Sequence, residues 1–178
     1  MLKPALLGHV PLDHAWIAAH IPHQGSMCLL DAVLHWDSQH LVCCATSHRH
    51  AGNPLRQFDR LGAACGIEYA AQAMAVHGVL VADHGRVPDP NRTPDDDRPT
   101  LGRPGGLLVS LRAVQLHVAR IDDIPAALEV CVERLSGDAR MLLYRFRVAT
   151  GDRLLLDGRA SVVLDAAGPA PSFASTPP

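Results

Sequence analysis

Residues 66–78 read GIEYAAQAMAVHG, and this stretch decides the fold. Glu68 and Gln72 are four residues apart, about one helical turn, so they share one face of a helix. Small or apolar side chains cover the other faces, and a helix that is apolar nearly all round is a buried helix. Because a buried glutamate is destabilising unless it is paired or titrating, Glu68 is the first candidate for a functional residue.

The composition predicts one domain and excludes several classes of function. Of the 178 residues, 48% are hydrophobic, which is enough for a single core. A net charge of −2 gives no electrostatic reason to expect binding to nucleic acid or to an anionic membrane. Five cysteines without a CxxC pair favour reduced thiols. With no signal peptide and no run approaching roughly 18 apolar residues, the sequence predicts a cytoplasmic protein.

The polar and apolar pattern outlines a hairpin, one helix and four further strands. Residues 27–36 and 40–47 are apolar segments joined by a short turn, which is typical of a hairpin. Asp13 is placed to cap a short helix, and Asp59 a long one that runs to about residue 81. From residue 107 apolar side chains recur at every second position in four segments that end near residue 164. A phase change near Ala113 predicts a bulge in the first of them.

An apolar helix of this kind needs a sheet curved around it. The pattern therefore predicts an α+β hotdog fold, an antiparallel sheet wrapped around one long buried central helix, as a single domain over residues 1–165. Residues 86–105 hold five prolines and are predicted to form a mobile surface loop. The low-complexity residues 166–178 are predicted to be a disordered tail.

Three motifs, in this order, resemble a known family. Residues 21–31 read IPHQGSMCLLD and resemble a segment of hotdog 3-hydroxyacyl-acyl-carrier-protein dehydratases of the FabZ/FabA type. Glu68 and Gln72 match the E-A-x-A-Q helix motif of these enzymes in spacing. The pair Ser47-His48, followed by residues 53–56 (NPLR), resembles the ApeP-like branch tied to aryl polyene and related pigment clusters. The M-P-G turn of the family is absent, and the loop before the helix is longer.

The resemblance implies that 3-hydroxyacyl thioesters on an acyl carrier protein are dehydrated to trans-2-enoyl thioesters, in a fatty-acid-like or polyene pigment pathway and without a cofactor. That reaction needs a base at C2 and an acid at C3 of the substrate. We expect Glu68, buried against apolar atoms, to have a raised pKa and to protonate the leaving hydroxyl. His48, where a strand leaves the sheet, is the expected base, and His50 is the rival candidate.

Four residues are predicted to bind substrate. His23 is expected to shape the pocket floor, and Gln72 to hold Glu68 or a backbone group. Asn53 and Gly66 complete the set, since backbone N–H groups where the helix begins can polarise a thioester carbonyl. A metal site at His48 and His50 is disfavoured, because the adjacent cysteines before them point to opposite faces of a strand and no second ligand pair has zinc spacing.

The resemblance also implies partners. Such proteins dimerise with the active site between subunits, so we expect a homodimer or a heterodimer with another hotdog protein. Arg49, Arg56 or Arg60 could meet an acidic carrier protein at the tunnel mouth. Two alternatives stay open. One is an acyl thioesterase on the same fold, in which the acidic residue activates water, and the other is a non-catalytic subunit of a hotdog heterodimer.

Overall fold

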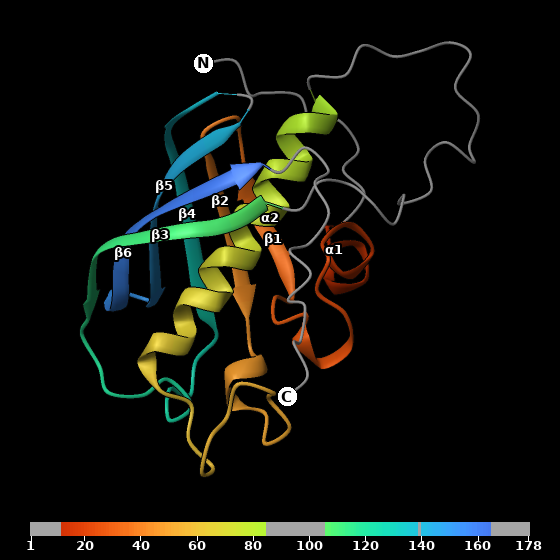
Figure 1. The fold of residues 1–178 in the computed structure, drawn as a ribbon. Helices are drawn as coiled ribbons and strands as arrows, with labels where there is room; N and C mark the ends of the chain where they lie inside the picture. Colours follow the sequence, from red (N-terminus) through yellow and green to blue (C-terminus); the bar gives the residue numbers. More distant parts are fainter. Residues whose placement is uncertain (1–11, 85–105, 139, 165–178) are drawn as a thin grey trace, which may run out of the picture.

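The computed structural model describes residues 12–84, 106–138 and 140–164 (Figure 1). The predicted loop 86–105 and tail 166–178 lie outside the described residues. In chain order, the helices and strands are α1 (His14–His20), β1 (Ala32–Trp36), β2 (His40–Ala45), α2 (Gly66–His84), β3 (Gly106–Leu116), β4 (Leu128–Gly137), β5 (Met141–Thr150) and β6 (Arg153–Leu164). Short 3-10 turns occupy Gly25–Met27, Ser47–Arg49 and Ala63–Cys65.

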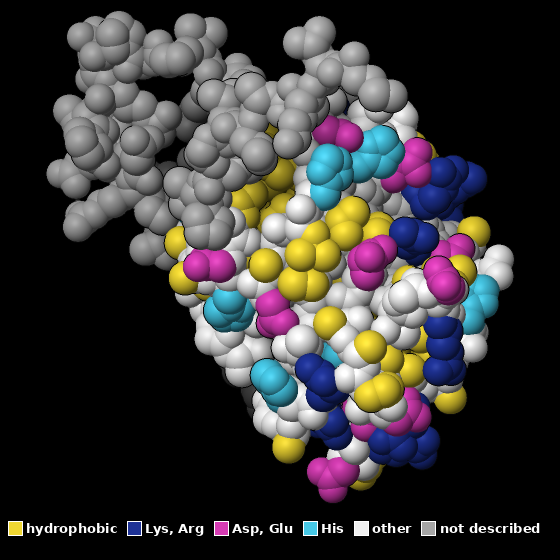
Figure 2. Space-filling view, turned by 180° about the vertical axis from the view of Figure 1, so that it is seen from behind, with side chains coloured by type: hydrophobic (Ala, Val, Ile, Leu, Met, Phe, Trp, Pro, Cys, Tyr) yellow, Lys and Arg dark blue, Asp and Glu magenta, His cyan; other side chains and the backbone are white. Residues whose placement is uncertain are grey.

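The six strands form one antiparallel sheet in the order β1-β2-β4-β5-β6-β3, and α2 packs against one face of it (Figure 1). Alternate side chains of the strands point at the helix and form the core. Val130, Tyr144 and Phe146 are almost fully buried there, as are Tyr69 and Ala73 of α2. The predicted α+β architecture, an antiparallel sheet around one long helix, is confirmed. Seen from the opposite side, the surface carries charged side chains of both signs among apolar ones (Figure 2).

Two local predictions are also confirmed. The Asp13 carboxylate accepts a hydrogen bond of 2.9 Å from the backbone N–H of Trp16 and so caps α1. Ala113 has φ +51°, and the pairing of β3 with β6 shifts register between Arg112 and Gln115. The bulge lies where the apolar alternation changes phase.

Two predicted element starts are wrong. Helix α2 begins at Gly66, whereas Asp59 lies in a tight turn with φ +57° and caps nothing. The strand predicted from residue 27 begins only at Ala32. Its earlier backbone is held by a side chain instead of a neighbouring strand, because the Met27 carbonyl and the Leu29 N–H both bond to Gln72.

Within the described residues, Ala63–Ala82 is long and apolar enough to cross a membrane by length and composition alone, with a mean hydropathy of 1.2. The prediction that no such run exists is therefore wrong. Half of this span is buried inside the structure. Packing of α2 against the sheet accounts for its apolar composition.

Candidate active site

Gln72 ties helix α2 to the segment that precedes β1. Its side chain is fully buried, and its Nε2 donates to the Met27 carbonyl at 2.7 Å and to Glu68 Oε1 at 3.0 Å. Its Oε1 accepts from the Leu29 N–H at 2.8 Å. If the amide oxygen and nitrogen were exchanged, the oxygen would face the Met27 carbonyl and Glu68 Oε1, which are also acceptors. The hydrogen bonds therefore require the present orientation. Gln72 thus fixes the segment after His23 relative to Glu68. The sequence predicted that it holds Glu68 or a backbone group, and in the structure it bonds to both.

Glu68 is paired with His23. His23 Nε2 donates to Glu68 Oε1 at 3.0 Å, and the two side chains are 26% and 31% exposed. This hydrogen bond, helped by the one from Gln72, lowers the pKa of Glu68 against the opposing effect of burial. The expected raised pKa is therefore wrong, and Glu68 is a carboxylate at neutral pH. Both donors reach the same oxygen, which leaves Oε2 without a protein donor among the described residues.

The structure does not bring His48 or His50 to Glu68 within one chain. The His48 ring is fully buried, and its Nε2 donates to the Ile124 carbonyl at 3.1 Å. Burial lowers the pKa of His48, so its ring is neutral. His50 is exposed on the loop that follows. A catalytic role for either residue stays a prediction, whereas the histidine in contact with Glu68 is His23, which we had expected to be structural.

Asn53, predicted to bind substrate, is buried and belongs to a network of hydrogen bonds inside the fold. Its Nδ2 donates to the Ser47 carbonyl at 3.0 Å and to the Tyr69 hydroxyl at 2.9 Å. Ser47 Oγ donates to the Leu29 carbonyl at 2.7 Å, so the Tyr69 hydroxyl donates to Ser47 Oγ at 2.9 Å. Tyr69 was missed from the sequence, although a hydroxyl at a helix position predicted to be buried signals a hydrogen-bonded partner.

Gly66 has a packing reason for its identity. A Cβ built at this position would lie 2.5 Å from Leu156 Cδ2, so a larger residue would require the Leu156 side chain to move. Its backbone N–H already donates to the carbonyls of Ala63 and Ala64. The predicted polarising donor at this position is therefore occupied within the chain.

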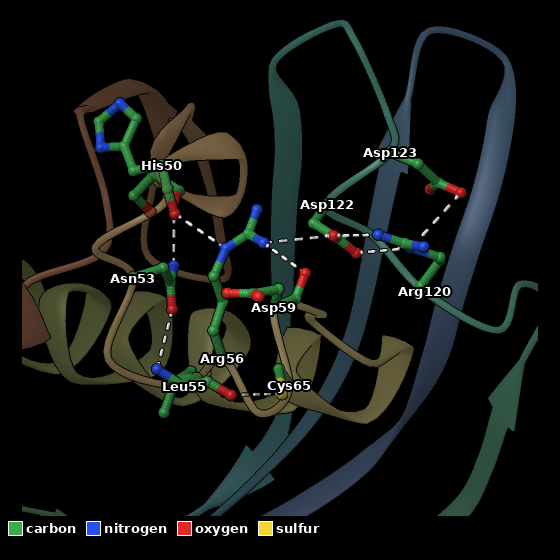
Figure 3. Close-up of polar contacts among 10 residues, drawn as sticks. His50, Asn53, Leu55, Arg56, Asp59, Cys65, Arg120, Asp122 and Asp123 are labelled. Carbon is green, nitrogen blue, oxygen red and sulfur yellow. Dashed lines mark hydrogen bonds and ion pairs between the residues drawn. The ribbon is translucent and has the colours of Figure 1, made fainter.

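The loop before α2 is closed by arginines (Figure 3). Arg56 donates to the His50 carbonyl at 2.9 Å and to the Asp59 carbonyl at 2.8 Å, and it lies 3.5 Å from the Asp122 carboxylate. The Arg120 guanidinium bonds to the same carboxylate and holds the pKa of Asp122 well below its usual range. Arg56, one of the three arginines considered for a carrier protein, thus has a structural role in this loop.

A cavity of about 480 Å³ runs along α2. Pro22, next to His23, lines it together with one face of α2. Side chains of β3, β5 and β6 form the opposite wall, among them Leu108, Tyr144 and Val162. The lining residues on α2 are mostly small, namely Ala71, Met74, Ala75, Gly78, Val79, Val81 and Ala82. The cavity is therefore a mainly apolar space, and the residues that line it nearest in sequence to His23 and Glu68 are Pro22 and Ala71.

The Tyr144 side of this cavity has one buried polar network. His77 Nε2 donates to the Asp37 carbonyl at 3.0 Å, so its Nδ1 accepts from the Tyr144 hydroxyl at 2.9 Å. Burial raises the pKa of Tyr144 to about 12 and lowers that of His77, so both groups are neutral.

The described part of the chain holds no group of three or more His, Cys, Asp or Glu side chains that could bind a metal ion.

Comparison with known proteins identifies the family. A family model described as ApeP-like, ApeP dehydratase, matches residues 15–169. The chain belongs to the ApeP-like dehydratase family. No curated protein matches the sequence.

Solved structures agree with this fold. This ApeP-like chain is similar to the dehydratase heterocomplex ApeI:P from Xenorhabdus doucetiae, with 20% identity, 88% of this chain and 92% of that chain covered, and a TM-score of 0.66. It is also similar to the HP0420-homologue from Helicobacter felis (10% identity, 92% and 96% covered, TM-score 0.58). Zebra fish thioesterase superfamily member 2 shares the fold as well (12% identity, 85% and 93% covered, TM-score 0.54). The predicted hotdog fold is confirmed, and it is shared by dehydratases and thioesterases.

Proposed function

We propose that this ApeP-like protein dehydrates 3-hydroxyacyl thioesters, carried by an acyl carrier protein, to trans-2-enoyl thioesters. The pathway we propose is a fatty-acid-like or polyene pigment pathway in the cytoplasm. The observation that carries the proposal is the ionised Glu68, held by His23 and Gln72, in a chain of a dehydratase family that also has an apolar cavity along α2.

The free oxygen of Glu68 suits the proton transfers of this reaction. Oε2 takes the proton from C2, and the electrons of that C–H bond form the C2–C3 double bond as the hydroxyl leaves C3. The same carboxyl group returns the proton to the departing hydroxyl, which leaves as water, and Glu68 is a carboxylate again. His23 keeps Oε1 in place during both transfers. His48 and His50 were predicted as the base at C2, from a neighbouring subunit. With Glu68 as the base, we propose that such a histidine acts as a second acid instead.

The cavity suits the acyl chain. It follows α2 from Ala71 to Ala82, and 82 − 71 = 11 residues of helix span roughly 16 Å. Apolar walls remove the chain from water, which is the main source of affinity for such a ligand. Gly78 lines this wall and leaves the cavity wide at that point, since no atom lies within 4 Å of a Cβ built there.

Strand β3 is the proposed site of a partner subunit. It is an edge strand of the sheet, and Leu107, Leu111 and Leu116 on it are 64%, 41% and 50% exposed. An edge strand with exposed apolar side chains pairs readily with another chain. The similar ApeI:P structure is of a heterocomplex, so we propose that β3 binds another hotdog protein, identical or different.

The test uses two thioester substrates and two variants. With a 3-hydroxyacyl thioester we expect a gain of enoyl absorbance, and Glu68→Gln should lower this rate about 100- to 10,000-fold. Glu129→Gln, which neutralises an exposed carboxylate paired with Arg147, is the control and should keep the rate. An enoyl rate that Glu68→Gln leaves intact would refute the assignment of Glu68 as the catalytic acid and base. No enoyl formation by the protein on its own would favour the non-catalytic subunit.

A thioesterase is the second candidate. The observation that favours it is the ionised and partly exposed Glu68 carboxylate, which could activate water without a second histidine. Incubation with a saturated acyl thioester separates the two activities. Release of free thiol from that substrate, without enoyl formation from the 3-hydroxyacyl thioester, would replace the dehydratase by the thioesterase.

A further inference from the structure

A row of charged side chains crosses the outer face of the sheet, the face turned away from α2. Directly opposite residues on neighbouring antiparallel strands point to the same face. Through four such pairings, the row runs across β2, β4, β5, β6 and β3 as His40, Glu133, Arg145, Arg159 and Arg112. Three consecutive members of the row are arginines.

Only one of these three arginines has an acidic partner. Arg145 bonds to Glu133 at 2.6 Å, whereas Arg159 and Arg112 are exposed and pair with no carboxylate of the described residues. The nearest acid along β6, Asp157, is taken by His117 at 2.7 Å. Like charges directly opposite each other across a sheet are destabilising. The folded chain therefore keeps an unfavourable pair of guanidinium groups on an open surface.

We propose that Arg112 and Arg159 dock an acidic helix of the carrier protein that presents the acyl substrate, an inference that rests on the proposed function. Neighbouring strands are about 4.8 Å apart, and carboxylates three or four residues apart on a helix start from Cβ atoms about 5–6 Å apart. One carboxylate can thus face each guanidinium. The planar, forked donor set of arginine matches a carboxylate in two parallel hydrogen bonds.

The position of the row suits delivery of a substrate to the cavity. Strand β3 carries both Arg112 and Leu108, which lines the cavity. The two residues are four apart, so their backbones lie about 13 Å from each other along the strand. A partner subunit that pairs along the edge of β3 would use its backbone groups, so the outer face that carries Arg112 and Arg159 stays accessible for docking. Arg49 and Arg56 of the loop are instead engaged with backbone carbonyls of their own chain.

The experiment compares two forms of the same 3-hydroxyacyl group, one on the carrier protein and one on N-acetylcysteamine, which lacks the carrier. Arg112→Gln and Arg159→Gln should each raise KM for the carrier-bound substrate about two- to fivefold, the effect of losing one exposed ion pair. The rate with the carrier-free thioester should not change. Arg153→Gln, at an exposed position by the β5–β6 turn, is the matched control and should change neither.

Two further measurements keep the docking surface separate from catalysis. Binding of the unacylated carrier protein, followed by calorimetry, should weaken in the double variant and in added salt, whatever the enzyme does with substrate. Thermal unfolding of the free protein should show a higher Tm for Arg159→Gln, because the repulsion on the row is relieved. Unchanged KM and unchanged carrier binding in the double variant would overturn the proposal, and equal effects of Arg153→Gln would do so as well. Failure of the dehydratase assay with intact carrier binding would refute the proposed function alone.

Discussion

Replacement of Gln72 by methionine tests whether one buried amide assembles the candidate site. Methionine has nearly the volume of glutamine but no N–H group and only a weakly accepting sulfur, so the substitution leaves the Met27 carbonyl without its donor and the Leu29 N–H without its amide acceptor. A buried polar group without a hydrogen-bond partner destabilises the fold by about 1–3 kcal/mol, and two such groups are created. Because Met27 is only partly buried, its carbonyl contributes less, so we expect a loss of about 2–5 kcal/mol in the free energy of unfolding. Because the donor to Glu68 Oε1 is lost as well, the acidic limb of the pH–rate profile should move to higher pH.

The matched control is Gln24→Met. The Gln24 amide also donates to two backbone carbonyls, those of Ala18 at 2.9 Å and Ile21 at 3.3 Å, but Gln24 is exposed and water can replace it. We therefore expect a loss below about 1 kcal/mol. Urea unfolding followed by circular dichroism measures both variants, and the pH dependence of kcat/KM measures the effect on Glu68. Equal losses of stability in the two variants, or an unchanged pH profile in Gln72→Met, would refute the reasoning.

Three other predictions follow from the same geometry. His23→Ala removes the largest cause of the lowered Glu68 pKa, so the acidic limb of kcat/KM should move to higher pH in a pH–rate series; an unmoved limb would show that His23 does not act on Glu68. Gly78→Leu places a side chain in the cavity and should lower kcat/KM for long acyl chains more than for short ones; equal effects on all chain lengths would exclude this wall from the acyl site. Gly78→Ala is the control and should raise the free energy of unfolding by about 1 kcal/mol, because alanine favours the helix and no atom lies within 4 Å of a Cβ built there. The lowered pKa of Asp122 stabilises the fold at pH values above the pKa of an unfolded aspartate, and this stability is lost as the pH falls through the pKa of the folded state. Asp122→Asn should therefore flatten the acid side of a curve of unfolding free energy against pH, and an unchanged curve would contradict the prediction.

The sequence was sufficient for the parts of the fold that depend on local periodicity. Alternation from residue 107 located β3 to β6, and the change of phase located the bulge at Ala113, because side-chain direction along a strand follows position alone. The Asp13 cap was also predictable, since its partner is three residues away. Asp59 has the same residue type, but its backbone lies in a left-handed turn closed by hydrogen bonds of 2.9 and 3.0 Å between Gln57 and Arg60. Residue type alone does not separate a capping aspartate from one in such a turn.

The candidate site was only partly predictable, because its contacts join distant parts of the chain. Glu68 and Gln72 were recognisable as a pair from their spacing, but Gln72 also holds the backbone at residues 27 and 29, which no local pattern reveals. Glu68 was predicted to act as an acid because the apolar residues next to it in the helix were assumed to surround its carboxylate and to raise its pKa. In the folded chain those neighbours face the sheet, whereas the carboxylate faces His23, which is 45 residues earlier (68 − 23).

This difference changes the order of events at the active site. A carboxyl group with a raised pKa would start protonated and would have to find a separate base for C2. The Glu68 carboxylate starts without a proton, because two donors hold its Oε1, and it can take the C2 proton itself at Oε2. The same donors that lower its pKa also weaken it as a base, so the proton it gains is readily passed on to the leaving hydroxyl. In the proposed reaction, one carboxyl group with a fixed oxygen and a free one can therefore perform both transfers, and a second histidine would speed the departure of water without being needed for the first step.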